Sequence, residues 1–105
     1  MTTTTPTYPD LPAPAGARPD DWQDDSPLPY RVLFGESRGV KGRRDSDGVT
    51  VQASAIQFSD GRVDDGCVHE PPQIHIDDYT YTVAQAREFA ARVIEAADLI
   101  DRWIG

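Results

Sequence analysis

Residues 82–105 carry the clearest helical pattern in the chain and read TVAQAREFAARVIEAADLIDRWIG. Apolar side chains recur there at alternating spacings of four and three residues, which predicts an amphipathic helix over about residues 82–104. This apolar seam consists of Ala86, Ala90, Val93, Ala97, Ile100 and Ile104, and it is widened on one flank by Phe89, Ala96 and Trp103. Thr82 and Gln85 have the spacing of a capping box, so we expect the helix to begin at Thr82.

The residues before this helix predict short β-strands. β-branched and aromatic side chains are frequent in residues 30–36, 49–63, 73–77 and 79–81. Within residues 49–63 the apolar alternation changes phase, which predicts a β-bulge near residues 54–56. Ser59, Asp60 and Gly61 then have the chemistry of a tight turn. Together these signals predict an α+β fold, a small antiparallel sheet of about three to five strands with the long C-terminal helix packed on one face.

The chain is expected to hold one folded domain preceded by an arm. Residues 1–29 contain seven of the nine prolines and five aspartates, a mixture with too few apolar side chains to offset the entropy of ordering. We therefore expect residues 1–29 to be disordered or extended and residues 30–105 to form a single α+β domain. The expected core combines strand residues with Phe89, Val93, Ala97 and Ile100 of the helix.

The formal net charge of −8 disfavours two classes of partner. Affinity for nucleic acids comes largely from neutralising phosphates, and anionic membrane surfaces likewise attract basic segments. Cys67 is the single cysteine, so no disulfide within one chain is expected. Since no apolar run approaches the length of a membrane span, we expect a cytoplasmic protein.

No sequence pattern predicts catalysis, a cofactor or a metal site. His69 and His75 are separated by two prolines at no recognised ligand spacing, and the aspartates nearby lie in turn-forming sequences. Ser54 and His75 can be paired on paper, but an exposed strand histidine is the simpler interpretation. No phosphate-binding glycine motif or nucleophile elbow is present. We therefore expect no enzyme activity, no catalytic or metal-binding residues and no cofactor.

One loop has the opposite sign of charge. Its basic residues are Arg38, Lys41, Arg43 and Arg44. They either contact a nucleic acid or an acidic partner, or belong to a solvated hairpin loop near Asp45 and Asp47. The loop lacks the interleaved aromatic residues that stack on bases. A small nucleic-acid-associated regulator that uses residues 38–44 is therefore the alternative hypothesis, and nucleic acid is not the expected partner.

The leading hypothesis is a module for protein–protein interaction. Trp22 interrupts the acidic arm, and an exposed tryptophan is costly there unless residues 20–29 dock on a surface. On the helix flank, Phe89 and Trp103 add more aromatic surface than a core of this size needs. The candidate protein-binding residues are therefore Trp22, Phe89, Ala96 and Trp103. Because a small core gains from burying a second face, we also expect a homodimer, helix against helix or sheet edge against sheet edge.

Three stretches support a resemblance that covers about residues 30–105. VTVQASAIQFSDG, HEPPQIHIDD and TVAQAREFAARVIEAADLIDRWI together resemble small uncharacterised proteins of actinobacteria, of mycobacterial type, and of their phages. Those proteins have a β-rich front half and a terminal helix of the form T-x-x-Q-A-R-x-x-A-x-x-x-x-x-A-A-D. They have no assigned activity, so no residue here inherits a role. The resemblance implies an intracellular accessory protein encoded by a phage or prophage, acting in the host cytoplasm on a host or phage protein.

Overall fold

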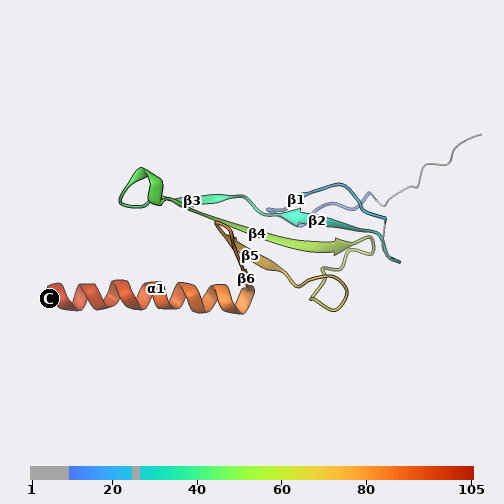
Figure 1. Cartoon of the computed structure of the whole chain (residues 1–105). Coiled ribbons are helices and arrows are strands. Elements are labelled where there is room, and N and C mark those ends of the chain that lie inside the picture. Colours follow the sequence, from blue (N-terminus) through green and yellow to red (C-terminus); the bar gives the residue numbers. More distant parts are fainter. Residues whose placement is uncertain (1–9, 25–26) are drawn as a thin grey trace, which may run out of the picture.

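The fold is an antiparallel β-sheet followed by one long helix (Figure 1). The computed structural model describes residues 10–24 and 27–105. Its elements are β1 (Arg18–Pro19), β2 (Tyr30–Phe34), β3 (Arg38–Val40), a 3-10 helix η1 (Asp45–Asp47), β4 (Val49–Phe58), β5 (Gln73–Ile76), β6 (Tyr79–Thr82) and α1 (Val83–Ile104). The predicted α+β class is confirmed, and the six described strands belong to one sheet.

Strand β4 is the centre of the sheet. On one edge it pairs with β2 along residues 54–58 and with β3 along residues 49–51. On the other edge it pairs with β5 along residues 51–54. β1 extends the sheet beyond β2, and β6 extends it beyond β5. The strand that carries the longest apolar pattern therefore has neighbours on both sides along most of its length.

The predicted β-bulge is wrong, because β4 runs unbroken from Val49 to Phe58. Its register with β2 is continuous, with Val32 opposite Ile56. The phase change in the sequence has another cause. Ile56, Gln57 and Phe58 are consecutive and all buried, so both faces of the sheet are covered at this end of β4.

One of these faces is covered by the described part of the arm. β1 pairs with β2, with Arg18 opposite Phe34. The Arg31 guanidinium donates a hydrogen bond of 2.8 Å to the Leu11 carbonyl and lies 4.5 Å from the centre of the Trp22 ring. The folded unit therefore begins before residue 30, and the arm adds a strand to it. Residues 1–9 and 25–26 of the expected arm lie outside the described residues.

The opposite face is covered by the loop between β4 and β5. The His69 ring lies 4.3 Å from the Tyr30 ring and 6.2 Å from the Phe58 ring, measured between ring centres. Among the described residues, the buried apolar side chains are Leu33, Ile56 and Phe58. The core is thus small and lies entirely at the β2–β4 end of the sheet.

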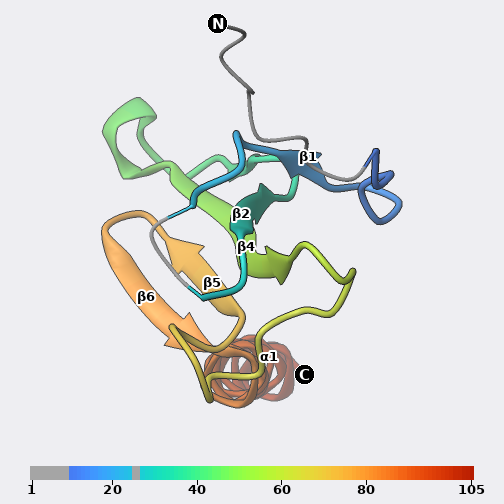
Figure 2. The ribbon, with the colours of Figure 1, turned by 90° about the vertical axis from the view of Figure 1, so that its right-hand side faces the viewer.

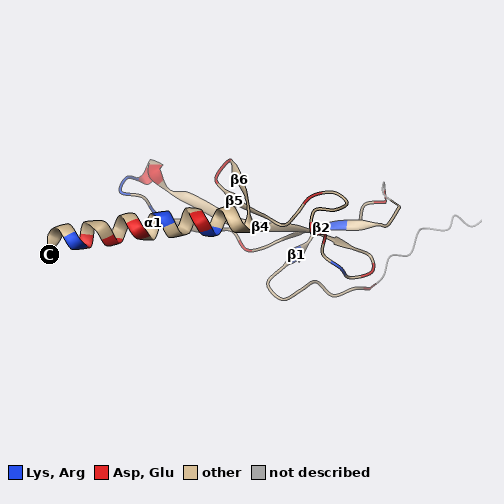
Figure 3. Cartoon of the chain, turned by 90° about the horizontal axis from the view of Figure 1, so that it is seen from below, with Lys and Arg blue, Asp and Glu red and all other residues tan. Residues whose placement is uncertain are grey.

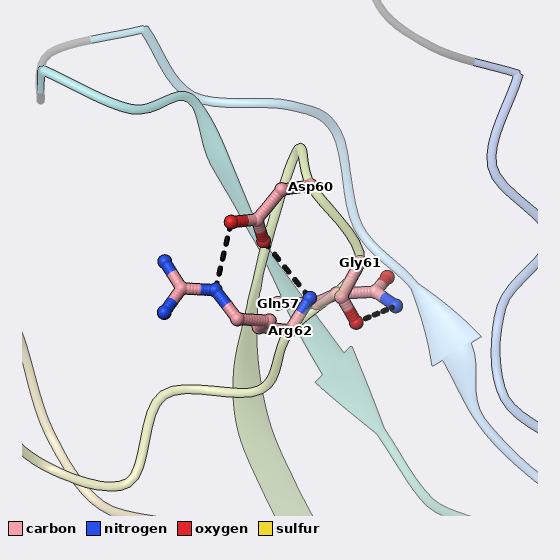
Figure 4. Close-up of polar contacts among 4 residues, drawn as sticks. All are labelled: Gln57, Asp60, Gly61 and Arg62. Carbon is pink, nitrogen blue, oxygen red and sulfur yellow. Dashed lines mark hydrogen bonds and ion pairs between the residues drawn. The ribbon is translucent and has the colours of Figure 1, made fainter.

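The tight turn predicted after β4 is confirmed (Figure 4). Gly61 has a φ of 95°, which a residue with a side chain rarely adopts, and its N–H donates to the Phe58 carbonyl at 2.9 Å. The Asp60 carboxylate accepts hydrogen bonds from the backbone N–H and the Nε of Arg62, at 3.0 and 2.7 Å. These bonds and then the charge of Arg62 hold the pKa of Asp60 below its usual value. Gln57 closes the turn by donating to the Gly61 carbonyl at 3.3 Å.

Helix α1 begins where predicted but does not pack on a face of the sheet. Phe89, Val93 and Ile100 were expected in the core, yet they are 44%, 54% and 46% exposed, and no residue of α1 is buried. Ala97 is exposed as well. The cause is the connection: β6 ends at Thr82 and α1 starts at the next residue. No loop residue is left to reverse the chain and lay the helix across the sheet.

The molecule is elongated as a result. Its radius of gyration is 19.0 Å, whereas a compact domain of 100 residues has about 13 Å. Figure 1 shows α1 leaving the end of β6 and running away from the β2–β4 end, and Figure 2 shows it end-on beside β5 and β6. Those two strands are its contacts within the described chain. None of the helices in residues 10–24 and 27–105 has the length and apolar character needed to span a membrane.

Candidate protein-interaction surface

Most of the exposed large apolar side chains of the described chain lie on α1. The apolar stripe comprises Ala86, Phe89, Ala90, Val93, Ile94, Ala96, Ala97, Ile100, Trp103 and Ile104. The exposed fraction is 44% at Phe89, 54% at Val93 and 46% at Ile100, and it is highest at the C-terminal end, with 70% at Trp103 and 81% at Ile104. The stripe runs from Ala86 to Ile104 along the helix of 22 residues, so it is about 28 Å long. An exposed apolar patch of a few hundred Å² on a protein surface is often functional.

Local sequence caps this helix at both ends. The Thr82 hydroxyl accepts a hydrogen bond from the Gln85 N–H at 3.1 Å, and the Gln85 side chain accepts one from the Thr82 N–H at 3.0 Å. At the other end, Gly105 adopts a φ of 103° and donates its N–H to the Asp101 carbonyl. Helices of fewer than about 12–15 residues are marginal alone, and α1 is longer than that. The stripe is therefore presented on a capped, continuous scaffold.

The stripe begins beside the sheet and continues along α1 beyond it. The Phe89 ring lies 5.8 Å from the Tyr81 ring of β6, measured between centres. Ala86 is half-buried beside it, whereas every residue of α1 beyond Ala86 is exposed. The side of α1 that faces the sheet is thus the same side that continues outward uncovered.

The structure separates the four predicted protein-binding residues into two groups. Phe89, Ala96 and Trp103 lie together on the stripe, as their spacing of seven predicts. Trp22 does not join them, because it is half-buried against Arg31 of β2 at the far end of the sheet. The apolar surface on α1 is also larger than predicted, since Val93 and Ile100 were assigned to the core. The direct succession of strand and helix at Thr82 was the signal that could have revealed this.

The basic loop projects at the tip of the β3–β4 hairpin, where its charges are partly neutralised. Arg38 forms an ion pair of 3.0 Å with Glu36, and Arg44 forms one of 2.9 Å with Asp47. Figure 3 shows the acidic segment of η1 directly beside the basic residues of the tip. Lys41 and Arg43 form no ion pair with any described residue. The structure therefore reduces the predicted basic set of four to two cations at the tip.

The comparisons with known proteins give no relative. No family model, curated protein or solved structure matches this chain. Roles for its residues must therefore come from the geometry of the molecule itself.

Asp64 is the most deeply buried charged group in the described chain, at 2% exposure, and it organises a loop. Burial raises the pKa of its carboxyl, but hydrogen bonds from backbone N–H groups outweigh this and leave the pKa below its usual value. Those donors are His69, Gly66, Glu70 and Val68, at 2.7, 2.9, 3.2 and 3.4 Å. Because the carboxylate oxygens are occupied by the loop that Asp64 holds, the residue acts as a structural anchor.

Two other polar sets contain residue types that occur in enzymes. Ser54 Oγ lies 2.7 Å from His75 Nε2, so the pair considered from the sequence does meet, and His75 Nδ1 lies 3.2 Å from the Thr80 hydroxyl. A neutral hydroxyl in that position cannot stabilise an imidazolium as a carboxylate does. The pKa of the Cys67 thiol is raised by the neighbouring Asp65 carboxylate, through a hydrogen bond and its charge, which opposes thiolate formation. Within the described residues, no group of three or more His, Cys, Asp and Glu side chains is arranged to hold a metal ion.

A shallow apolar cavity of about 360 Å³ lies between the arm, β2, β4 and the start of α1. Its lining includes Leu33, Ala55, Ile74 and Val83, together with residues 14–17 of the arm. The cavity borders the stripe at Val83 but contains no convergent charged groups that would orient a small polar ligand. The stripe on α1 is therefore the stronger candidate for a binding surface.

Proposed function

We propose that this chain is a non-enzymatic accessory protein that acts by protein–protein interaction, and that the apolar stripe of α1 is its interaction surface. The observation that carries this proposal is a capped helix of 22 residues without a single buried side chain. Its apolar residues follow the spacing with which an amphipathic helix docks into a protein partner. The polar face of the same helix remains suited to solvent.

The energetics favour a protein partner for this surface. Burying one large apolar side chain is worth about 1.5–3 kcal/mol. Phe89 and Trp103 are of the residue types enriched at the centres of protein interfaces, and both lie in the exposed part of the stripe. The small residues Ala90, Ala96 and Ala97 between them allow a partner backbone to approach closely.

The setting of this interaction is part of the proposal. The resemblance to small actinobacterial and phage proteins supports an accessory role inside a bacterial cell, for a chain encoded by a phage or prophage. The acidic balance of the chain supports a protein partner over a nucleic acid.

The test is affinity capture of the full chain from cells that naturally produce it. We expect the wild type to retain a specific protein, either this chain itself or another, and a Val93→Asp/Ile100→Asp variant to lose it. An Ala84→Asp/Ala91→Asp variant adds the same charge to the outer face of α1 and is the matched control. Circular dichroism establishes that both variants keep the helix. Equal retention by the two variants would contradict the proposal.

A second candidate function is a nucleic-acid-associated regulator. The observation in its favour is that Lys41 and Arg43 have no ionic partner among the described residues and lie at a projecting hairpin tip. It predicts a salt-dependent mobility shift on DNA or RNA that a Lys41→Ala/Arg43→Ala variant abolishes, whereas an Arg62→Ala variant retains it. No shift at low salt would exclude this candidate.

A further inference from the structure

We infer that the partner of the apolar stripe is a second copy of this chain, whose α1 lies antiparallel against the first. This inference rests on the proposed function, since it names the occupant of the same surface. It is carried by three properties of α1: the sizes of facing side chains, the positions of two unpaired charges, and the length of the exposed stripe.

Side-chain size is complementary when α1 is placed against itself in reverse. The seam residues then meet in three kinds of layer, which are Ala86 with Ile104, Ala90 with Ile100, and Val93 with Ala97. Each layer combines a smaller side chain from one copy with a larger one from the other. Such alternation fills the space between two helices at a close and constant separation of about 8–10 Å.

The two flanks of the stripe match in the same register. An antiparallel pair is related by a two-fold axis perpendicular to the helices, so each flank meets its own counterpart. On one flank Arg87 faces Asp101 of the second copy, with Ile94 near the axis. On the other flank Phe89 faces Trp103 of the second copy, with Ala96 near the axis. Opposite charges meet on one side and aromatic rings meet on the other.

The charges concerned are available for this contact. The ion pair on α1 joins Arg92 and Glu95 on the outer face. Neither Arg87 nor Asp101 forms an ion pair with any described residue of its own chain. In the antiparallel arrangement Arg87 of each copy pairs with Asp101 of the other, so this contact forms twice per dimer. The two helix dipoles then also lie antiparallel, which is favourable.

A parallel pair lacks this complementarity. Identical residues would then face one another, so Ala86 would meet Ala86 and Ile104 would meet Ile104. Layers of two small side chains would leave voids and layers of two large ones would separate the helices. Arg87 would lie beside the opposite flank, which carries Phe89 and no acidic residue of the stripe.

The length of the stripe indicates the strength of the dimer. Each copy contributes a strip of about 28 Å by 10 Å, or about 280 Å², which is less than the area of about 800 Å² that each partner buries in a standard stable interface. We therefore expect a dissociation constant on the order of micromolar. In this register the overlap of the two helices ends at the sheet, because Ile104 of the second copy lies opposite Ala86, the residue at which α1 meets the sheet.

The experiment is a charge exchange followed by sedimentation velocity of the full chain at low to high micromolar concentration. Arg87→Asp and Asp101→Arg each place like charges opposite one another twice per dimer, and we expect each to weaken dimerisation about tenfold. An equimolar mixture of the two variants restores both attractions, so it should dimerise about as strongly as the wild type. The double variant Arg87→Asp/Asp101→Arg should also recover.

A cross-linking experiment tests, independently of charge, which face of α1 forms the dimer contact. In a Cys67→Ser background, Ala96→Cys lies near the two-fold axis and should form an intermolecular disulfide on mild oxidation. Ala91→Cys is the matched control, because it replaces the same residue type on the outer face of α1, and it should remain a monomer on a non-reducing gel.

Each outcome decides between the two proposals. A wild type that is monomeric throughout the series, yet captures another protein through Val93 and Ile100, overturns the second-copy inference and leaves the proposed function standing. A dimer that is unaffected by either charge variant, or a mixture that fails to recover, overturns the antiparallel register. A monomer that captures nothing through the stripe overturns both.

Discussion

The two ends of this molecule contain the same kinds of apolar residue, but these residues are buried at one end and exposed at the other. At the β2–β4 end, Ile56 and Phe58 are about 5% exposed or less, because the loop around Asp64 covers their face of the sheet. Along α1, Ile100 and Phe89 are 46% and 44% exposed. Connectivity makes the difference, since loops fold back over the sheet whereas α1 follows β6 without a loop. Residue type alone therefore does not decide which apolar surface becomes core and which is left for a partner.

The comparison predicts that truncating two isoleucines, one at each end, changes the free energy of unfolding by very different amounts. Ile56→Ala should lower the free energy of unfolding by about 2–5 kcal/mol, because it removes methylene groups from a packed site. Ile100→Ala, measured at concentrations where the chain is monomeric, should change it by about 0.5 kcal/mol or less. Urea unfolding followed by circular dichroism measures both. Equal losses would show that α1 is packed against the sheet in solution.

Two arginines extend the comparison to polar contacts. Arg31 is 6% exposed and its Nε donates to the Gln57 side chain at 2.9 Å, besides its bond to Leu11. Arg31→Ala should therefore cost about 1.5–3 kcal/mol of unfolding free energy, since it leaves buried acceptors without their charged donor. Arg92→Ala removes an exposed ion pair and should cost about 0.5 kcal/mol or less. If chemical unfolding gave Arg92→Ala the larger loss, the helix would be the more tightly held region.

Acid should affect the sheet end through Asp64. Its pKa in the folded chain lies below the unfolded value of about 3.9, so its stabilising contribution is present above that pH and is lost as the pH falls through the folded pKa. Trp22 reports on this end, and a Trp103→Phe variant leaves Trp22 as the only tryptophan. We expect Asp64→Asn to lower stability at neutral pH and to flatten its decline below about pH 4, followed by Trp22 fluorescence. An unchanged acid profile would show that the loop is anchored in another way.

A smaller effect than those at the sheet end is expected at the helix start. Thr82→Ala removes the hydroxyl that accepts the hydrogen bond from the Gln85 N–H. It should reduce stability by about 1 kcal/mol, seen as fraying of α1 by circular dichroism. Because α1 has few contacts with the sheet, the fluorescence of Trp22 should not change. A simultaneous change at Trp22 would indicate that the two ends of the molecule unfold as one unit.

Much of the architecture could be predicted because it depends on local signals. The capping pair Thr82 and Gln85 and the apolar spacing predicted α1 to within a residue, and Gly61 predicted its turn. The phase change at residues 54–56 was misread as a bulge, because alternation reports which faces are covered and not how the backbone runs. The candidate site was predicted in part: Phe89, Ala96 and Trp103 share a face of α1, whereas Trp22 lies against Arg31 of β2.

The sequence by itself determined the helix, its caps, its apolar face and most of the strands, because each depends on residues a few positions apart. Only the tertiary structure decided what covers those faces. The burial of Leu33 and Ile56 depends on the arm and the loop of Asp64 closing over the sheet, and the exposure of the stripe depends on α1 pointing away from it. Such long-range contacts arise from chain direction and connection length, which no single residue pattern encodes.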